Sequence, residues 1–142
     1  MNVESIAVIG AGTMGNGIAQ VCAVRGFPVI MTDVAQPALE RGLATISGSL
    51  DRLVNRQKLT QADKEAALAR ISTATTLEAT RDCDLIIEAA TENPGLKLRI
   101  FGEADKLAKP SAIIASNTSS ISITRLAAAT GRPEQVIGMH FF

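Results

Sequence analysis

One stretch near the start of the chain restricts the fold more than any other. The apolar run Ile6 to Ile9 passes straight into Gly10, Gly12 and Gly15 in the pattern G-x-G-x-x-G, and an amphipathic segment follows. Such a run indicates a buried strand, and the segment after the glycines indicates a helix. The first glycine permits a tight turn, the second lets a pyrophosphate approach the backbone, and the third allows close helix packing. The pattern therefore predicts a strand–turn–helix unit that binds a dinucleotide.

The beginning of that helix and an acid further along complete the predicted cofactor site. Backbone N–H groups are unpaired at a helix start, here Thr13 and Met14, and the positive end of the helix dipole stabilises phosphate. A second apolar run, residues 28–32, ends at Asp33, which follows Gly15 by 18 residues. A carboxylate there accepts hydrogen bonds from the adenosine ribose and repels a 2′-phosphate. No Arg directly follows Asp33 to hold a 2′-phosphate, so NAD is favoured over NADP. The alternative to a dinucleotide site is a tight strand-to-helix turn with an incidental surface Asp.

Composition narrows the class of protein. A chain of 142 residues is long enough for one domain with a real core. Lys plus Arg equals Asp plus Glu at 14 each, which gives no support for a nucleic-acid or anionic-membrane partner. Cys22 and Cys83 form no C-x-x-C pair and are expected to be reduced packing residues. We see no metal site, no signal peptide and no apolar run near the ~18 residues of a membrane span, so we expect a cytoplasmic protein.

The order of the predicted elements points to an α/β fold. Strands are predicted at 5–9, 28–32, 70–74, 85–88, 113–116 and 136–140. Helices are predicted at 13–25, 36–55, 61–69, 94–108 and 123–130, with a short turn at 77–80. Several strands are continuously apolar, which is typical of a parallel sheet buried on both faces. We therefore expect a doubly wound, mostly parallel, Rossmann-like sheet with right-handed crossovers.

The interval between the second and third strands is long enough for a helical hairpin. The helix at 36–55 has one apolar face, and Arg52, Arg56 and Lys58 lie at its end and in the following turn. One interpretation is a solvated helix end, where basic residues are favoured by the helix dipole. The other is a protruding hairpin that offers a basic spot to a phosphorylated ligand.

Polar residues follow three of the later strands. The fourth strand is followed by Glu92, the fifth by a hydroxyl cluster that includes Ser119, and the sixth ends at His140, the only histidine. Ligands of open α/β sheets bind beyond the carboxyl ends of the strands, so these side chains are candidates for chemistry. Histidine suits a general base because its ordinary pKa, about 6.5, lies near working pH. Each residue alone also has a plain structural explanation, as a helix charge, a turn serine or a structural histidine.

Four motifs resemble the L-3-hydroxyacyl-CoA dehydrogenase family, most of all its bacterial 3-hydroxybutyryl-CoA branch. They are Ser-Asn-Thr-Ser-Ser-Ile-Ser-Ile at 116–123, Ile-Gly-Met-His-Phe-Phe at 137–142, Glu-Ala-Ala-Thr-Glu-Asn at 88–93 with Lys97, and the glycine motif at 10–15. The resemblance covers nearly the whole chain, and the spacing of the first two motifs is highly specific. It implies an NAD-dependent oxidoreductase that interconverts (S)-3-hydroxyacyl-CoA and 3-oxoacyl-CoA.

The resemblance also implies roles for individual residues. His140 matches the base that removes the proton of the 3-hydroxyl, and Ser119 matches the serine that hydrogen-bonds the substrate oxygen near the nicotinamide. Asp33 matches the acid that binds the adenosine ribose. The remaining matches are Glu92 and Lys97 for cofactor contact and Ser49 and Arg56 for coenzyme A contact.

The family continues beyond His-Phe-Phe with an acid that orients the histidine and with a helical second domain. That domain supplies most of the homodimer contact and part of the acyl-CoA site. We therefore expect residues 1–142 to be the NAD-binding domain of a longer homodimeric enzyme, with little activity by itself. Two alternatives stay open: a dehydrogenase of a hydroxy acid or sugar acid without coenzyme A, and an NAD-binding module without turnover.

Overall fold

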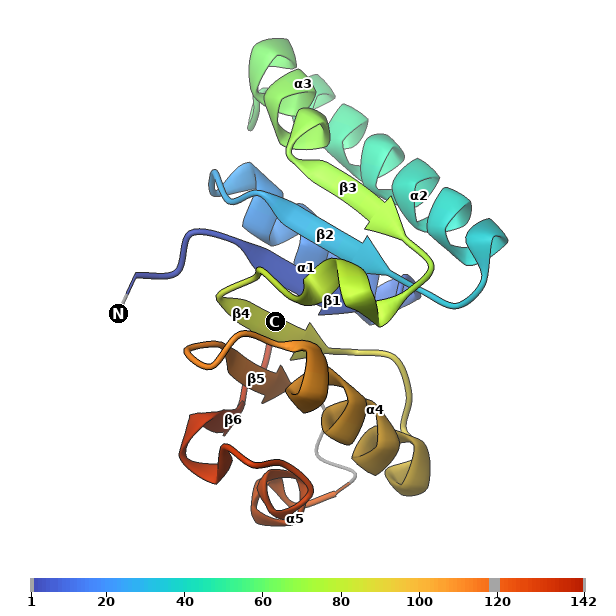
Figure 1. The fold of residues 1–142 in the computed structure, drawn as a ribbon. Helices are drawn as coiled ribbons and strands as arrows, with labels where there is room; N and C mark the ends of the chain where they lie inside the picture. The colour runs from blue at the N-terminus through green and yellow to red at the C-terminus, as the bar shows by residue number, and fades with distance from the viewer. Residues whose placement is uncertain (1, 118–120, 142) are drawn as a thin grey trace.

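The computed structural model describes residues 2–117 and 121–141, which form one α/β sheet structure (Figure 1). The strands are β1 (Ile6–Ile9), β2 (Val29–Thr32), β3 (Ile71–Ala74), β4 (Leu85–Glu88), β5 (Ile113–Ser116) and β6 (Val136–Gly138). They lie in the order β3-β2-β1-β4-β5-β6, and every pair of neighbours is parallel. The doubly wound, Rossmann-like sheet predicted from the sequence is confirmed.

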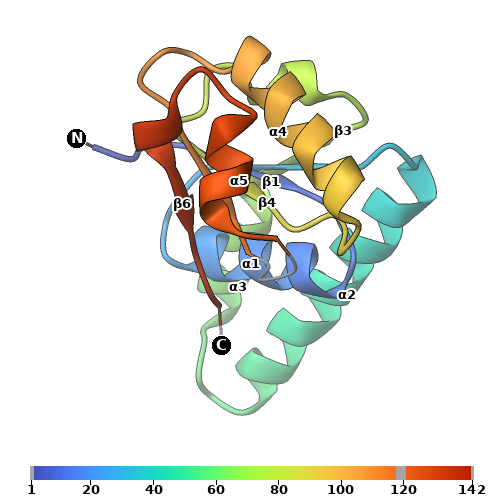
Figure 2. The same ribbon diagram turned by 90° about the horizontal axis from the view of Figure 1, so that it is seen from below.

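Helices cover both faces of this sheet. They are α1 (Thr13–Val24), α2 (Gln36–Asn55), α3 (Gln61–Ala69), α4 (Pro94–Leu107) and α5 (Ile123–Ala128), with short 3-10 turns η1 (Leu77–Thr80) and η2 (Pro133–Gln135). Figure 2 shows α1, α2 and α3 on one face and α4 and α5 on the other. The sheet thus separates two apolar cores, and β1 contributes to both: Ile6 and Val8 pack with α1–α3, while Ala7 and Ile9 pack with α4 and α5.

The long crossover between β2 and β3 is the predicted helical hairpin. The side of α2 that faces the molecule buries Leu39, Ile46 and Leu50 completely. Thr60 begins α3 with a reciprocal cap, because its side chain accepts from the Asp63 N–H while the Asp63 carboxylate accepts from the Thr60 N–H. In Figure 2 the end of the hairpin extends past α1 and away from the sheet.

Element ends differ from the sequence predictions near the C-terminal side. Strand β6 ends at Gly138, not at His140, because its partner β5 ends at Ser116, which is opposite Gly138. The Met139 N–H still donates to the Ser116 carbonyl at 2.9 Å, so the chain leaves the sheet only after that residue. Helix α5 stops at Ala128, and the η2 turn before β6 was not predicted.

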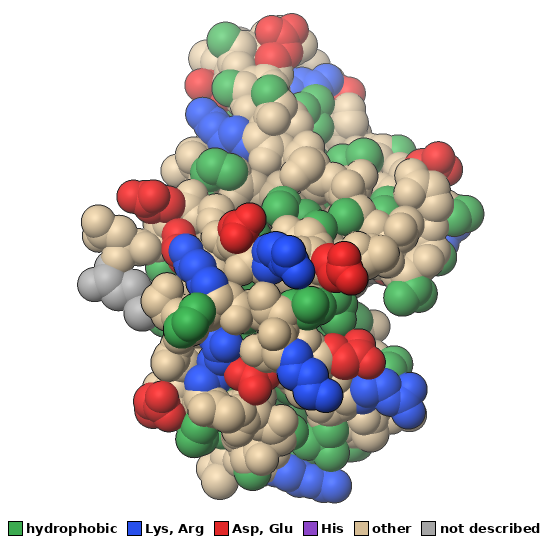
Figure 3. All heavy atoms as spheres, viewed as in Figure 1, with side chains coloured by type: hydrophobic (Ala, Val, Ile, Leu, Met, Phe, Trp, Pro, Cys, Tyr) green, Lys and Arg blue, Asp and Glu red, His purple; other side chains and the backbone are tan. Residues whose placement is uncertain are grey.

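The cysteines, the surface charges and the hydropathy of the helices can now be compared with the expectations from composition. Cys22 and Cys83 are buried free thiols, and burial raises the pKa of both. Basic and acidic side chains are interspersed on the face shown in Figure 3. Within the described ranges, no helix is long and apolar enough to span a membrane.

Arg132 joins the end of α4 to the segment before β6. Its Nε donates to Asp105 Oδ1 at 2.6 Å, and its two Nη atoms donate to the carbonyls of Asp105, Ala108, Lys109 and Ala112. The carbonyls of Asp105 and Ala108 lie at the C-terminal end of α4, where carbonyls have no partner within the helix, and the guanidinium supplies their donors. The carbonyls of Lys109 and Ala112 also accept from the Ala112 N–H and from Gln135 Nε2.

We predict that Arg132→Ala lowers the free energy of unfolding by on the order of 3 kcal/mol, because it strands a carboxylate and the carbonyls at the end of α4. Urea denaturation measures the change. Arg125→Ala removes the same charge from an exposed position of α5 and is expected to cost less than about 0.5 kcal/mol. Equal effects of the two substitutions would contradict the role given to Arg132.

Candidate functional site

The turn between β1 and α1 requires glycine at two positions. Gly10 has φ +112°, and a Cβ there would lie 2.8 Å from both the Ala89 carbonyl oxygen and the Ala90 Cα. A Cβ at Gly15 would lie 1.8 Å from the carbonyl oxygen of Gly10, so the first turn of α1 packs directly on the end of β1. These contacts match the tight-turn and close-packing roles predicted for the two glycines.

Gly12 differs from its two neighbours because space is left open beside it. No atom of the described chain lies within 4 Å of the position that its Cβ would take. Gly12 is also the N-cap of α1 and makes no side-chain cap, and Thr13 and Met14 are exposed at the helix start. An open approach to the positive end of a helix fits a pyrophosphate, so the residues present fit the predicted cofactor.

Asp33 connects the end of β2 to this turn. Its Oδ2 accepts from the Ala11 N–H at 3.1 Å, and its Oδ1 accepts from the Ala35 N–H at 3.1 Å. A carboxylate has about four lone-pair sites, so each oxygen keeps capacity for a ribose hydroxyl. The same contacts orient the carboxylate and the glycine turn relative to each other.

A cavity of about 570 Å³ lies beside Asp33 at the carboxyl ends of the strands. Its volume falls in the range of roughly 300–1,000 Å³ that is common for small-molecule sites. Leu77, Leu96 and Ile100 are among the apolar side chains that line it. Thr32 also lines the cavity and is only 2% exposed, and its Oγ1 has no hydrogen-bond partner in the described chain. The combination of apolar walls, Asp33 and this hydroxyl fits the adenosine half of NAD.

The predicted cofactor residues after β4 lie in two different environments. Glu92 is exposed, one residue before Asn93, which caps α4 by accepting from the Leu96 N–H at 3.0 Å. The Lys97 side chain is completely buried, and its Nζ donates to Glu88 Oε1 at 2.7 Å. The cofactor contact of Lys97 stays a prediction, and the structure shows a different contact for its charge.

His140 lies just beyond the sheet edge formed by β5 and β6, where it is exposed. The bond from Met139 to Ser116 places it next to the chain that leaves β5. Ser119 belongs to the segment 118–120, which lies outside the described residues, so its role in substrate binding stays a prediction. The carboxyl edge thus holds the glycine turn, Asp33, Glu92 and His140.

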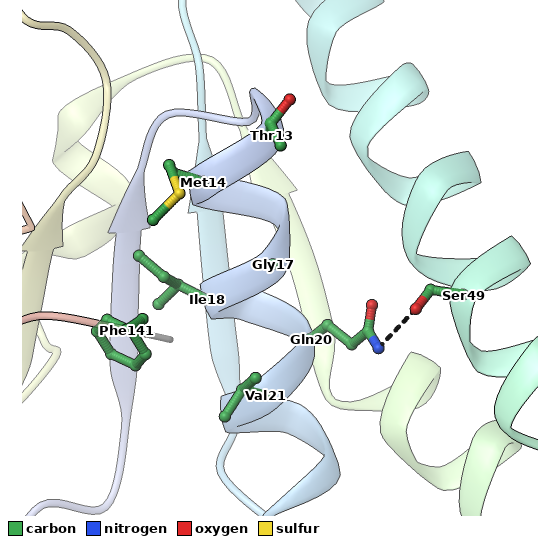
Figure 4. Close-up of a pocket in the computed structure, with 8 residues that line it drawn as sticks. All are labelled: Thr13, Met14, Gly17, Ile18, Gln20, Val21, Ser49 and Phe141. Atoms are coloured by element: carbon green, nitrogen blue, oxygen red, sulfur yellow. Dashed lines mark hydrogen bonds between the residues drawn. The ribbon is translucent and has the colours of Figure 1, made fainter.

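Ser49 lies in a separate hollow between α1 and α2. The hollow has a volume of about 340 Å³, and Met14, Ile18 and Phe141 are among its lining residues. Figure 4 shows the Gln20 side chain reaching across from α1, where its Nε2 donates to Ser49 Oγ at 3.0 Å. Because that hydroxyl accepts from Gln20, its own proton remains available to a ligand acceptor.

Arg56 is exposed directly after α2, seven residues beyond Ser49. Seven residues are about two helical turns, or roughly 10 Å along the axis, and return to nearly the same face. Ser49 and Arg56 therefore follow one line along the hairpin, with the basic residue toward its tip.

The sequence analysis did not identify three residues that shape this region. Glu88 is the one charged residue of an otherwise apolar strand, a signal that was available. Gly42 of α2 lies so close to the glycine turn that a Cβ would be 2.9 Å from the Ala11 carbonyl oxygen. Gln20 had no signal, because a glutamine on a helix has no preferred meaning until its neighbour is known.

Comparison with known proteins agrees with this geometry. The family model for the NAD-binding domain of 3-hydroxyacyl-CoA dehydrogenase matches residues 5–142. A 3-hydroxybutyryl-CoA dehydrogenase of Bradyrhizobium diazoefficiens is 52% identical over 139 residues, which are 98% of this chain and 47% of that protein. The crystal structure of (S)-3-hydroxybutyryl-CoA dehydrogenase from Ralstonia eutropha has a TM-score of 0.96 at 52% identity over 99% of this chain and 50% of that one.

A third match is the crystal structure of 3-hydroxybutyryl-CoA dehydrogenase from Escherichia coli, with a TM-score of 0.97 and 42% identity. It covers 100% of this chain and 30% of that one. The chain spans about half the length of the curated Bradyrhizobium relative.

We predict that Gly12→Val abolishes NADH binding and leaves the fold intact. A branched side chain would fill the space that the pyrophosphate needs, yet it meets no atom of the described chain. The dissociation constant should rise at least about 100-fold, or roughly 2.7 kcal/mol, while the unfolding midpoint stays near that of the parent. Gly48→Val, in α2, where a Cβ would lie 3.8 Å from Arg52 Nη1, should bind NADH normally. Parent-like affinity of Gly12→Val would refute the phosphate role of this turn.

We also predict that the chain binds NADH more than tenfold tighter than NADPH. Two unit charges about 4 Å apart repel by roughly 4 kcal/mol at an effective dielectric of 20, and Asp33 would face the 2′-phosphate. Calorimetric titration with both cofactors measures the difference, and Asp33→Asn should narrow it. Equal affinities of the parent would show that Asp33 does not set the preference.

Proposed function

The chain belongs to the family of NAD-binding domains of 3-hydroxyacyl-CoA dehydrogenases, and on this premise we propose that it serves an enzyme that interconverts (S)-3-hydroxyacyl-CoA and 3-oxoacyl-CoA. We infer 3-hydroxybutyryl-CoA as the substrate, because the Bradyrhizobium and Ralstonia relatives are 3-hydroxybutyryl-CoA dehydrogenases. One observation supports this most: the glycine turn, Asp33 and His140 share a single edge of the sheet, beside the hollow that contains Ser49.

In this proposal the chain's own residues divide the work by position. The glycine turn and the start of α1 bind the pyrophosphate, and Asp33 binds the adenosine ribose. NAD, when bound, accepts the hydride from C3 of the substrate. His140 takes the proton of the 3-hydroxyl, and Ser119 hydrogen-bonds the same oxygen. The exposed position of His140 leaves it open to a substrate that approaches the edge.

The coenzyme A part of the substrate is proposed to lie along α2. Ser49 offers a hydroxyl proton in an apolar hollow. Arg56 offers a cation about two helical turns further along, where the phosphate groups of coenzyme A would lie. This assigns the predicted hairpin residues to one continuous surface. It favours the ligand-binding interpretation of the basic hairpin over the plain solvated helix end.

A homodimer of the enzyme that carries this domain, and a cytoplasmic location, belong to the same proposal. The homodimer is what the family resemblance implies, and the cytoplasmic location is the expectation drawn from the sequence itself. Analytical ultracentrifugation of that enzyme tests the dimer.

We predict that Ser49→Ala and Arg56→Ala weaken the binding of acetoacetyl-CoA and leave the NADH affinity unchanged. Loss of one hydrogen bond costs about 1 kcal/mol, so Ser49→Ala should raise the dissociation constant about fivefold. Arg56→Ala should act mainly at low salt, because exposed charges are screened. Isothermal titration with acetoacetyl-CoA measures both.

Arg81→Ala is the matched control, since it removes an equal charge from an exposed site after η1. It should bind acetoacetyl-CoA like the parent. If free 3-hydroxybutyrate binds as tightly as its coenzyme A ester, the substrate is a hydroxy acid without coenzyme A. If the parent binds NADH and neither ligand, the chain is an NAD-binding module.

A further inference from the structure

A fully buried ion pair joins β4 to α4. Lys97 Nζ lies 2.7 Å from Glu88 Oε1, and both side chains have no exposed surface. Removing two charges from water is costly, and an apolar pair of similar size is often as stable or more stable. The fold alone therefore gives little reason to have this pair at the centre of the molecule.

The carboxylate of Glu88 contacts three separate segments. Oε1 accepts from Lys97 of α4 and from Ser116 Oγ at the end of β5, the latter at 3.1 Å. Oε2 accepts from the Ala90 N–H at 2.8 Å and from the Thr91 N–H at 3.4 Å, in the turn that follows β4. One side chain thus links a helix, a strand end and a loop.

The loop and the strand end each lead to a part of the proposed site. The turn after β4 packs directly against the glycine turn between β1 and α1, since a Cβ at Gly10 would be 2.8 Å from Ala90 Cα. The same turn continues to Glu92. Ser116 is the strand end whose carbonyl accepts from the Met139 N–H, one residue before His140. The Glu88 carboxylate has no exposed surface, so it acts on the site through these segments.

We propose that Glu88 and Lys97 are a positioning pair for the dinucleotide, an inference that rests on the proposed function of NAD binding. The Glu88 carboxylate holds the turn after β4 against the phosphate turn and keeps the end of β5 in place. Lys97 places the opposite charge beside the buried carboxylate, and both carboxylate oxygens accept hydrogen bonds. The bound cofactor then meets a surface that is already ordered, which lowers the cost of ordering it on binding.

The double variant Glu88→Leu, Lys97→Met separates positioning from stability. It leaves no buried charge, so its unfolding midpoint should return near that of the parent even where the single variants are destabilised. Leucine has no hydrogen-bonding atom, so it holds neither the Ala90 N–H nor the Ser116 hydroxyl. We expect the double variant to bind NADH at least about tenfold more weakly at a temperature where it is fully folded. A purely structural pair would restore stability and affinity together.

Asp105→Asn is the control. Asp105 lies on α4, as Lys97 does, and the substitution disrupts its ion pair with Arg132 away from the site. It should lower stability without changing the NADH affinity. If the double variant does not fold, Ser116→Ala takes its place and should weaken NADH binding about fivefold.

Parent-like affinity of the folded double variant, or of Ser116→Ala in its place, overturns the proposal. Failure of the parent to bind NADH would instead refute the proposed function, so the two failures are distinguishable.

Discussion

The close approach of α1 to the end of β1 is the constraint on which the rest of the structure depends. Gly15 lies so near the Gly10 carbonyl that no side chain fits between them, and the turn after β4 covers Gly10 from the other side. Gly42 lets α2 approach the same turn at Ala11. Four segments therefore meet around a few backbone atoms, and a side chain at any of these three glycines would displace a whole element. Gly12 is the exception, and its open side is where a ligand can enter.

Two acids stabilise this meeting point in similar ways but with different exposure. Asp33 and Glu88 stand at or next to the ends of β2 and β4, on either side of β1, and each accepts two backbone N–H groups, Asp33 with both oxygens and Glu88 with Oε2. Asp33 is partly exposed and borders a cavity, so it can exchange water for ribose hydroxyls. Glu88 is fully buried and needs a cation, which Lys97 provides. The same kind of turn-orienting carboxylate is thus open to a ligand at Asp33 and enclosed by the protein at Glu88.

Much of this fold could be predicted from the sequence, because its signals are local. Alternation of strands and helices predicts the parallel sheet, the glycine spacing predicts the turn after β1, and Thr60 with Asp63 predicts the cap of α3. Long-range partners could not be predicted in the same way. Lys97 resembled a surface cofactor contact, since nothing in the sequence reports that α4 turns its side chain inward toward Glu88. The end of β6 was also missed, because it depends on where the neighbouring strand β5 stops.

The arrangement divides the carboxyl edge into two halves that meet at β1 and β4. Asp33, Thr32 and the apolar cavity lie on the β2 side, where adenosine is proposed to bind. His140 lies on the β6 side, where it is exposed after the chain has left the sheet. A reaction on the β6 side depends on side-chain positions that the residues on the β2 side cannot fix. The buried contacts of Glu88 connect the turn after β4, which lies on the glycine turn, to the end of β5. The Glu88 carboxylate therefore influences the binding surface although its own side chain is buried.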